Sequence, residues 1–404
     1  MATTAPQVAG GPTGPASTTP EHAPLGRSLA AFVLTALLAT GQMYAVIPLM
    51  GEMASEWHAD TASMTWLVSA FGFGYAGGFV LFGPLADRCG HRRVVVAGVL
   101  AAAVATGLVA TVPGVAAAVA ARVLQGLMIA AFPPCVLTYI AERSAPQHRM
   151  VKTTAVTTAF LASAVVAQIA AQIIADALGW RMVFAASALA FAVMALALRT
   201  VMLPDRPTTT SSPLDAYRAV PALLRNPRLR LLYAATPAVF GSFVAVYTGL
   251  QLTGTAGSPQ ALLALRASAL PVMLVVPFLT PWLRRITSAF RIALALLFAS
   301  VVNLLTALLA PGTTGLSILL MAFVAGIAVA APAMIETVGA RADRARSTAI
   351  SLSTFWFFVG AGLGPLLAGA LTSSGFGTLL LVLAAVLACG AALVLVTARR
   401  HAAR

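Results

Sequence analysis

The amino-acid sequence predicts an all-α membrane protein whose twelve transmembrane helices form two pseudo-symmetric six-helix bundles. Composition is the first of three observations behind this prediction. Of the 404 residues, 60% are hydrophobic and 9% are charged, with a mean hydropathy of +0.92. Soluble domains carry about 25% charged residues. The chain therefore belongs in a lipid bilayer, where helices pair all of their backbone polar groups internally.

The second observation is a series of apolar stretches, each close to the length of about 20 residues that crosses the hydrocarbon core. Turn signals such as Pro113-Gly114 and Gly179 separate neighbouring stretches. In chain order, the expected helices are 28–50, 64–86, 93–112, 114–140, 153–178, 180–202, 229–252, 260–283, 290–310, 315–338, 347–372 and 375–398.

The third observation is a long polar connection in the middle of the chain, which divides the helices six and six. It combines Pro204, a Thr-Ser run at 208–212 and a basic amphipathic stretch. The expected organisation is an N-terminal bundle over 28–202, a cytoplasmic linker over 203–228 and a C-terminal bundle over 229–398. Residues 1–27, rich in Ala, Pro, Thr and Gly, predict a disordered cytoplasmic tail, and residues 399–404 a second cytoplasmic tail.

The two halves also resemble each other at a shift of about 196 residues. The matched positions are Pro84 with Pro281, Arg149 with Arg346, and Gly179-Trp180 with Gly375-Phe376. In membrane proteins, repeats of this kind surround a site near mid-membrane, at the interface of the halves, that opens to each side in turn.

The net charge of +14 could indicate a nucleic-acid partner, but its distribution does not. Of the 25 Lys and Arg residues, all but Arg122, Arg181 and Arg266 lie in the N-terminal segment, in alternate connections or in the C-terminal tail. The connection after the first helix is acidic instead. This alternation follows the positive-inside rule and predicts that both termini are cytoplasmic. We therefore expect the lipid bilayer, and no nucleic acid, as a partner.

The most specific motif is the charged loop Gly83-Pro84-Leu85-Ala86-Asp87-Arg88-Cys89-Gly90-His91-Arg92-Arg93. Gly90 permits a tight chain reversal, and the charged side chains can pair with facing helix ends when a gate closes. The string resembles the loop G-x-L-A-D-R-x-G-R-R between the second and third helices of the major facilitator superfamily, although His91 stands where that family usually has Arg or Lys. The candidate gate residues are Gly83, Asp87, Arg88, Gly90, Arg92 and Arg93.

This resemblance covers about residues 25–400 and is to bacterial drug- and metabolite-efflux members of the superfamily. It implies a multi-pass protein of the bacterial inner membrane that works by rocking of its two halves. It also implies that the charged loop braces the cytoplasmic gate while the protein is open to the outside.

Ionisable groups inside a bilayer are costly and are therefore candidates for function. Arg122 and Gln125 match the R-x-x-Q-G string that the resemblance places in the fourth helix of proton-coupled facilitators. We expect Arg122 to hydrogen-bond to Gln42 or Gln168 and to line the cavity, with Gln172 on the same helix face as Gln168. The alternative is an Arg–Gln clamp that holds helices together and takes no part in transport.

Proton coupling requires a group that changes protonation on the transport path. Every histidine lies in a tail or a loop, and Glu336 is the best internal carboxylate, with Arg341 and Arg344 nearby in the sequence. A static ion pair at the cytoplasmic gate is the alternative role for Glu336. Coupling to protons therefore stays an open alternative at this point.

Four aromatic residues are candidates for the wall of the cavity. Tyr44, Trp66, Tyr75 and Trp356 lie in expected helices and could receive an apolar or aromatic substrate. The alternative for each is packing, or anchoring at the membrane surface.

Together with the resemblance, these features predict a secondary active transporter that works by alternating access and exports small apolar or cationic compounds in exchange for protons. A facilitator or exporter of a polar metabolite, such as a sugar or amino acid, is the alternative, and a membrane receptor or enzyme is the least supported. The sequence has no P-loop and no histidine or paired aspartates within its expected helices. We therefore expect no enzyme activity, no cofactor and no metal, and a monomer with a small-molecule substrate.

Overall fold

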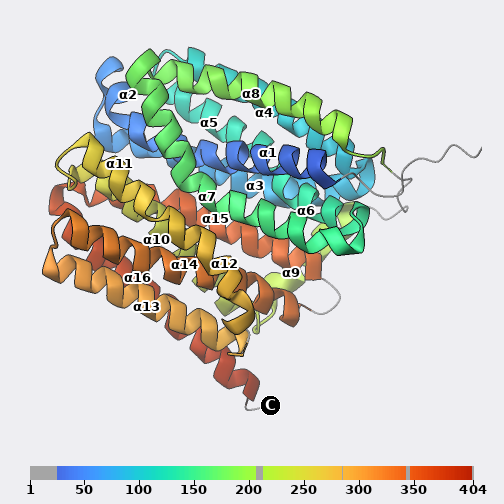
Figure 1. Ribbon diagram of the computed structural model, residues 1–404. Helices are drawn as coiled ribbons and strands as arrows, with labels where there is room; N and C mark the ends of the chain where they lie inside the picture. Colours follow the sequence, from blue (N-terminus) through green and yellow to red (C-terminus); the bar gives the residue numbers. More distant parts are fainter. Residues whose placement is uncertain (1–24, 206–212, 284, 343–345, 403–404) are drawn as a thin grey trace, which may run out of the picture.

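The computed structural model describes residues 25–205, 213–283, 285–342 and 346–402, and every regular element in these ranges is a helix (Figure 1). Most of the expected tail 1–27 lies outside the described ranges, but the first helix already begins at Leu25. At the other terminus the last helix continues to Ala402, so the expected tail at 399–404 is helical as far as the structure describes it. Residues 206–212 of the linker also lie outside the described ranges.

The N-terminal half follows the expected apolar stretches closely. Its elements are α1 (Leu25–Ala45), η1 (Ile47–Leu49), α2 (Met50–Glu56), η2 (Thr61–Met64), α3 (Thr65–Cys89), α4 (His91–Thr111), α5 (Val115–Ile129), α6 (Phe132–Arg143), α7 (Pro146–Leu178) and α8 (Trp180–Val201). The linker contains one further helix, α9 (Pro213–Arg225).

The C-terminal half likewise consists of helices that follow the expected apolar stretches. They are α10 (Arg230–Thr253), α11 (Pro259–Ser268), α12 (Leu270–Leu283), α13 (Ser288–Leu309), α14 (Thr313–Arg341), α15 (Arg346–Ala370), η4 (Thr372–Ser374) and α16 (Gly375–Ala402). Within the described ranges, eleven segments are long and apolar enough to span a membrane.

The remaining expected helix, 260–283, is the eighth in chain order, and it is present but broken. It consists of α11, with 10 residues, and α12, with 14 residues, and the break falls at Ala269, just before Leu270-Pro271. Proline lacks a backbone N–H and disfavours helical backbone in the residue before it. The same effect separates α5 from α6 just before Pro133-Pro134. Pro332, by contrast, lies inside the continuous helix α14.

Helix packing follows the same plan in both halves, as the internal repeat predicted. In the N-terminal half α1 packs on α7 and α4 packs on α8, while in the C-terminal half α10 packs on α15 and α13 packs on α16. The halves meet where α3 packs on α15 and where α7 packs on α11 and α12. These two contacts are also equivalent, because each joins the second spanning segment of one half to the fifth of the other.

Glycines allow the helix backbones to approach closely. A Cβ atom on Gly74 of α3 would lie 2.1 Å from the carbonyl oxygen of Val123 in α5, and one on Gly126 of α5 would lie 2.2 Å from the carbonyl oxygen of Phe71 in α3. In lipid, where apolar side chains gain little by leaving the solvent, such contacts between small residues are a main source of helix association.

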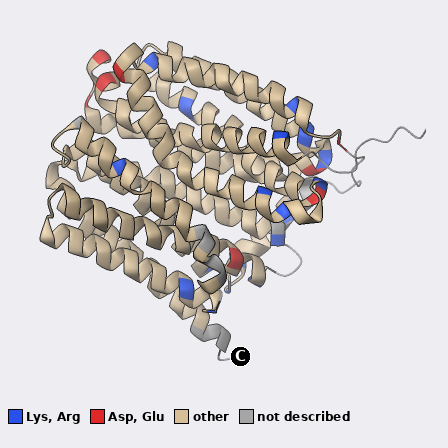
Figure 2. Cartoon of the chain, viewed as in Figure 1, with Lys and Arg blue, Asp and Glu red and all other residues tan. Residues whose placement is uncertain are grey.

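Charge is distributed unevenly along the bundle. Figure 2 shows Lys and Arg gathered at the end that carries the loop between α3 and α4, and acidic residues near α2 at the opposite end. We call the first the basic end. The start of α1, the linker helix α9 and the end of α16 also lie at the basic end (Figure 1).

The close contact at Gly74 generates a direct test. We expect Gly74→Ala to lower the free energy of unfolding by about 1–3 kcal/mol, the usual cost of forcing an extra methyl group into a packed interior. Gly77→Ala on the same helix is the matched control, because a Cβ atom there meets nothing within 4 Å. Thermal unfolding of both variants in detergent measures the difference, and equal stability would contradict the backbone contact.

Candidate functional site

A cavity of about 450 Å³ lies between the two halves of the molecule. Helices α1, α3, α6 and α7 line one side, and α10, α12, α14 and α15 line the other. The lining includes no charged side chain among the described residues. Its polar groups are hydroxyls alone, on Thr40, Tyr44, Tyr75, Thr138, Thr157, Ser351 and Thr354.

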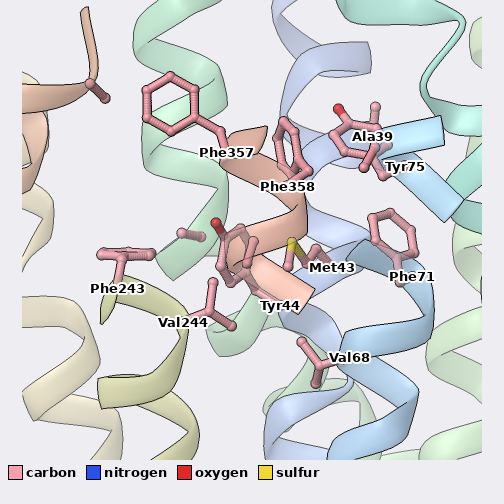
Figure 3. Packing of buried hydrophobic residues seen from close by; sticks show 14 of the residues in the cluster. Ala39, Met43, Tyr44, Val68, Phe71, Tyr75, Phe243, Val244, Phe357 and Phe358 are labelled. Carbon is pink, nitrogen blue, oxygen red and sulfur yellow. The ribbon is translucent and has the colours of Figure 1, made fainter. Parts of the chain in front are cut away.

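Aromatic side chains form much of the cavity wall and close one end of it. The ring of Phe358 on α15 meets Tyr75 on α3 edge to face at 4.4 Å between centroids, and Tyr44 on α1 meets Phe243 on α10 in the same way at 5.9 Å (Figure 3). Beyond them, a Cβ atom on Gly72 would lie 3.0 Å from the backbone of Gly362. These contacts join the two halves, so the cavity is shut at the end opposite the basic end.

Toward the basic end the cavity continues into a second hollow of about 290 Å³. The two share Pro134, Thr138 and Ser351 in their linings, and the second hollow also touches Asp87 and His91. The charged loop therefore lies at the mouth of the cavity.

At this mouth the buried side chain of His91 lies between two carboxylates. His91 Nε2 lies 3.7 Å from Asp87 Oδ1, and His91 Nδ1 lies 3.9 Å from Glu142 Oε2. The side chain of His91 is 11% exposed and that of Asp87 is 69% exposed. A protonated His91 would pair with both carboxylates, whereas a neutral one would leave them without this positive charge.

Asp205 holds the charged loop to the start of the linker, a contact that the sequence analysis missed. Its carboxylate accepts hydrogen bonds from the backbone N–H groups of Arg92 at 2.8 Å and Arg93 at 3.2 Å, in the first turn of α4. An anion is stabilised there by the unpaired N–H groups and the helix dipole. Gly90 has φ +95°, and any Cβ atom on it would collide with Asp205. The only sequence signal was an aspartate directly after a helix end.

The remaining loop residues take different places. Gly83 lines the second hollow, and Asp87 and Arg88 are exposed at the basic end. The guanidinium of Arg92 donates to the carbonyl oxygen of Arg199 at the end of α8. The loop is therefore fastened to its own half, and the ion pair of Asp87 with His91 also lies within that half.

Arg122 is fully buried and its guanidinium meets three different acceptors. Nε donates to the carbonyl oxygen of Leu67 at 3.0 Å, Nη1 to Oε1 of Gln125 at 2.6 Å, and Nη2 to the carbonyl oxygen of Gln42 at 3.0 Å. The ring of Phe71 lies 4.6 Å from the guanidinium carbon. The expected bond to Gln42 is present, through its backbone.

One part of that expectation is wrong for this arrangement, namely that Arg122 lines the cavity, and of the two alternative partners the structure has Gln42. Arg122 is absent from the lining of the cavity, and Gln168 donates to the carbonyl oxygen of Ala164 on its own helix. The amide of Gln125 instead extends the Arg122 network, donating to Oε1 of Gln42 at 3.2 Å and to Oγ1 of Thr106 at 2.9 Å. The network thus joins α1, α3, α4 and α5, which is the geometry of a clamp within the N-terminal half.

The other candidates are dispersed. Glu336 on α14 pairs with the buried Arg291 of α13, rather than with Arg341, and Arg344 lies outside the described residues. Gln172 is bonded to Asp176 near the far end of α7. Of the four aromatic candidates, Tyr44 and Tyr75 line the cavity, whereas Trp66 is 49% exposed on the outside and Trp356 is absent from the lining.

Comparison with known protein families agrees with this architecture. The model of the Major Facilitator Superfamily matches residues 32–339, which is most of the chain. The chain belongs to the major facilitator superfamily. It is therefore a member of a family of membrane transporters and has the all-α membrane fold that the sequence predicted.

Individual relatives share 26–36% of their residues with this major facilitator protein, each over only a part of the chain. A protein of Streptomyces coelicolor named "Probable transporter" is 26% identical over 271 residues, which cover 61% of each chain. A Bacillus subtilis protein, provisionally named as a niacin/nicotinamide transporter, is 29% identical over 38% of each chain. The tetracenomycin C resistance and export protein of Streptomyces glaucescens is 36% identical over 80 residues, 20% of this chain and 15% of that protein. The matches span less than two thirds of each of these relatives.

The three hydrogen bonds of the Arg122 guanidinium lead to a second prediction. We expect Arg122→Lys to lower the free energy of unfolding by about 2 kcal/mol or more, because one ammonium nitrogen cannot reach three separated acceptors and leaves buried carbonyl groups unpaired. Thermal unfolding in detergent measures the loss. Arg181→Lys is the control, since its ammonium can still pair with Glu56 at the surface. Equal unfolding temperatures for the two variants would contradict the clamp.

Proposed function

We propose that this major facilitator protein is a secondary active transporter that exports small apolar or cationic compounds in exchange for protons. The observation that carries the proposal is the central cavity, with aromatic rings, aliphatic side chains and hydroxyls in its described lining and no charge. Apolar compounds gain by leaving water for such a wall. Cations are attracted to the faces of aromatic rings.

Alternating access follows from how the cavity is closed. One end is shut by contacts between side chains of α1 and α10 and between α3 and α15, all of which cross from one half to the other. Rocking of the two halves would separate these pairs of side chains and close the mouth of the cavity. By the positive-inside rule, the basic end is the cytoplasmic one, so the cavity collects compounds from inside the cell.

Export is supported by one short match to an export protein. Proton exchange is supported by the cluster of His91, Asp87 and Glu142 at the cavity mouth. Histidine changes its charge between about pH 5 and 8, which makes it suited to respond to the proton gradient of a cell. Closure of the mouth would bring the exposed Asp87 toward the C-terminal half.

The experiment that tests the proposal uses the purified protein in liposomes that contain a pH-sensitive dye. We expect lipophilic cations and uncharged aromatic compounds to cross the membrane and to move protons in the opposite direction. Transport of neither class would overturn the proposed substrates, and transport without proton movement would overturn the exchange.

A charge in the cavity wall should abolish this activity. Thr354 of α15 lines the cavity, and its hydroxyl only bonds to the carbonyl oxygen of Ile350 on its own helix. We expect Thr354→Arg to reduce transport of lipophilic cations at least tenfold, because a fixed positive charge repels them in a site of low dielectric constant. Thr354→Val keeps the volume and the neutral wall and should transport nearly as well as the original protein. Equal loss in both variants would show that charge is not the cause.

The histidine at the mouth should set the pH dependence. We expect His91→Arg to weaken the dependence of transport on internal pH, because arginine keeps its charge at every pH of the assay and cannot release a proton there. The charged groups around this position are Asp87 of α3, Glu142 and Arg143 of α6, and Asp205 of the linker. His148→Arg, at the same end of the molecule, is the control. An unchanged pH profile in His91→Arg would contradict the role assigned to the cluster.

A further inference from the structure

A second buried arginine, in the C-terminal half, lacks the partners that Arg122 has. Arg266 of α11 is 1% exposed and makes one hydrogen bond, from Nη2 to Oε1 of Gln251 at the end of α10. Its buried Nε has no hydrogen-bond partner, and no carboxylate among the described side chains pairs with it. Buried charges without a partner are costly, and inside a membrane they mark functional sites.

Arg122 and Arg266 differ in their hydrogen bonding, and this difference distinguishes an arginine with a structural role from one that binds a ligand. Arg122 has all three of its nitrogen atoms bonded and an aromatic ring over its guanidinium. Arg266 has the same charge and the same burial but retains an unused donor. A guanidinium presents five N–H groups in a fork that fits a carboxylate or another planar anion. Arg266 therefore lacks an acceptor for Nε, which a carboxylate or another planar anion could supply.

Arg266 lies just beyond the closed end of the cavity. Phe243, Tyr247 and Gln251 follow one another at intervals of four residues along α10 and so share one face of this helix. Phe243 lines the cavity, the ring of Tyr247 lies 5.1 Å from that of Phe243, and Gln251 binds Arg266. The row leads from the cavity wall to the guanidinium.

Tyr247 adds a second unused polar group to this place. Its hydroxyl is buried without a hydrogen-bond partner, and Tyr247 lies one helical turn before Gln251, the residue that binds Arg266. A hydroxyl can donate to an anion as readily as an N–H group does. Nε of Arg266 and the hydroxyl of Tyr247 are thus two buried hydrogen-bond donors without an acceptor, and both belong to residues next to Gln251.

We propose that Arg266, Gln251 and Tyr247 form an anion-binding site between α10 and α11, which becomes accessible when Tyr44 and Phe243 separate. The inference rests on the proposed alternating access, because in the arrangement described here those two rings lie between the site and the cavity. The anion is either an acidic group carried by a transported aromatic compound or a small inorganic anion. Both would bind through charge-assisted hydrogen bonds to the same donors.

The test measures binding to the full-length protein in detergent, with naphthoate, its uncharged counterpart naphthamide, and chloride against gluconate as the background salt. We expect naphthoate to bind at least tenfold more tightly than naphthamide, or chloride to raise the unfolding temperature relative to gluconate. The first result identifies an acidic substrate group and the second an inorganic anion. Neither effect in the original protein would overturn the site.

Variants assign the effect to Arg266. Arg266→Gln should remove at least nine tenths of the anion effect and leave naphthamide binding unchanged, while Arg266→Lys should retain part of it. Arg181→Gln removes the same charge at the same end of the molecule, away from this cluster, and should change nothing. An anion effect that survives in Arg266→Gln would overturn the proposal.

The Gln251→Glu variant keeps Arg266, so its folding does not depend on whether the protein tolerates the loss of this arginine. It places a carboxylate beside Arg266 and so supplies the missing anion from within the chain. We expect it to fold with an equal or higher unfolding temperature and to lose the anion effect; persistence of that effect would overturn the site. Liposome transport of lipophilic cations by the original protein tests the proposed function separately, since that assay requires no anion at Arg266.

Discussion

Lipid offers no hydrogen-bond partner to a polar group, and this constraint shapes every level of the structure. It makes every described element a helix, and it leaves close packing rather than the hydrophobic effect to hold the helices together. The contacts of Gly74 and Gly126 between α3 and α5 show the result, since a single methyl group would not fit at either position. The helices within each half are thereby packed tightly against one another, which the proposed alternating access requires.

The same constraint makes the two buried arginines informative. Arg122 satisfies it within the N-terminal half, through two backbone carbonyl groups and Gln125, and so ties four helices together. Arg266 does not satisfy it with the groups that the structure describes. A folded chain tolerates such a group where a ligand, rather than the protein, completes the bonding during part of the working cycle.

The division of charge suits a transporter that handles uncharged or weakly solvated compounds. The central cavity is neutral, while the ionisable cluster of His91, Asp87 and Glu142 lies at its mouth. A compound inside the cavity therefore meets no fixed charge from its described lining, and in the proposed cycle the charged groups act at the mouth. Asp205 holds the charged loop in place at this mouth. It anchors the loop to the linker, which is the segment of chain that joins the two halves.

The sequence by itself determined the membrane location, the helical class, the division into halves and the family. These properties depend on the hydropathy of continuous stretches and on one contiguous loop motif, which are local in the chain. Only the tertiary structure decided that helix 260–283 is broken at Ala269, that Asp205 holds the charged loop, and that Arg122 is absent from the cavity lining while Nε of Arg266 lacks a hydrogen-bond partner. Each of these depends on which groups from distant segments come within hydrogen-bond range, a distance of about 3 Å that spacing along a helix cannot specify.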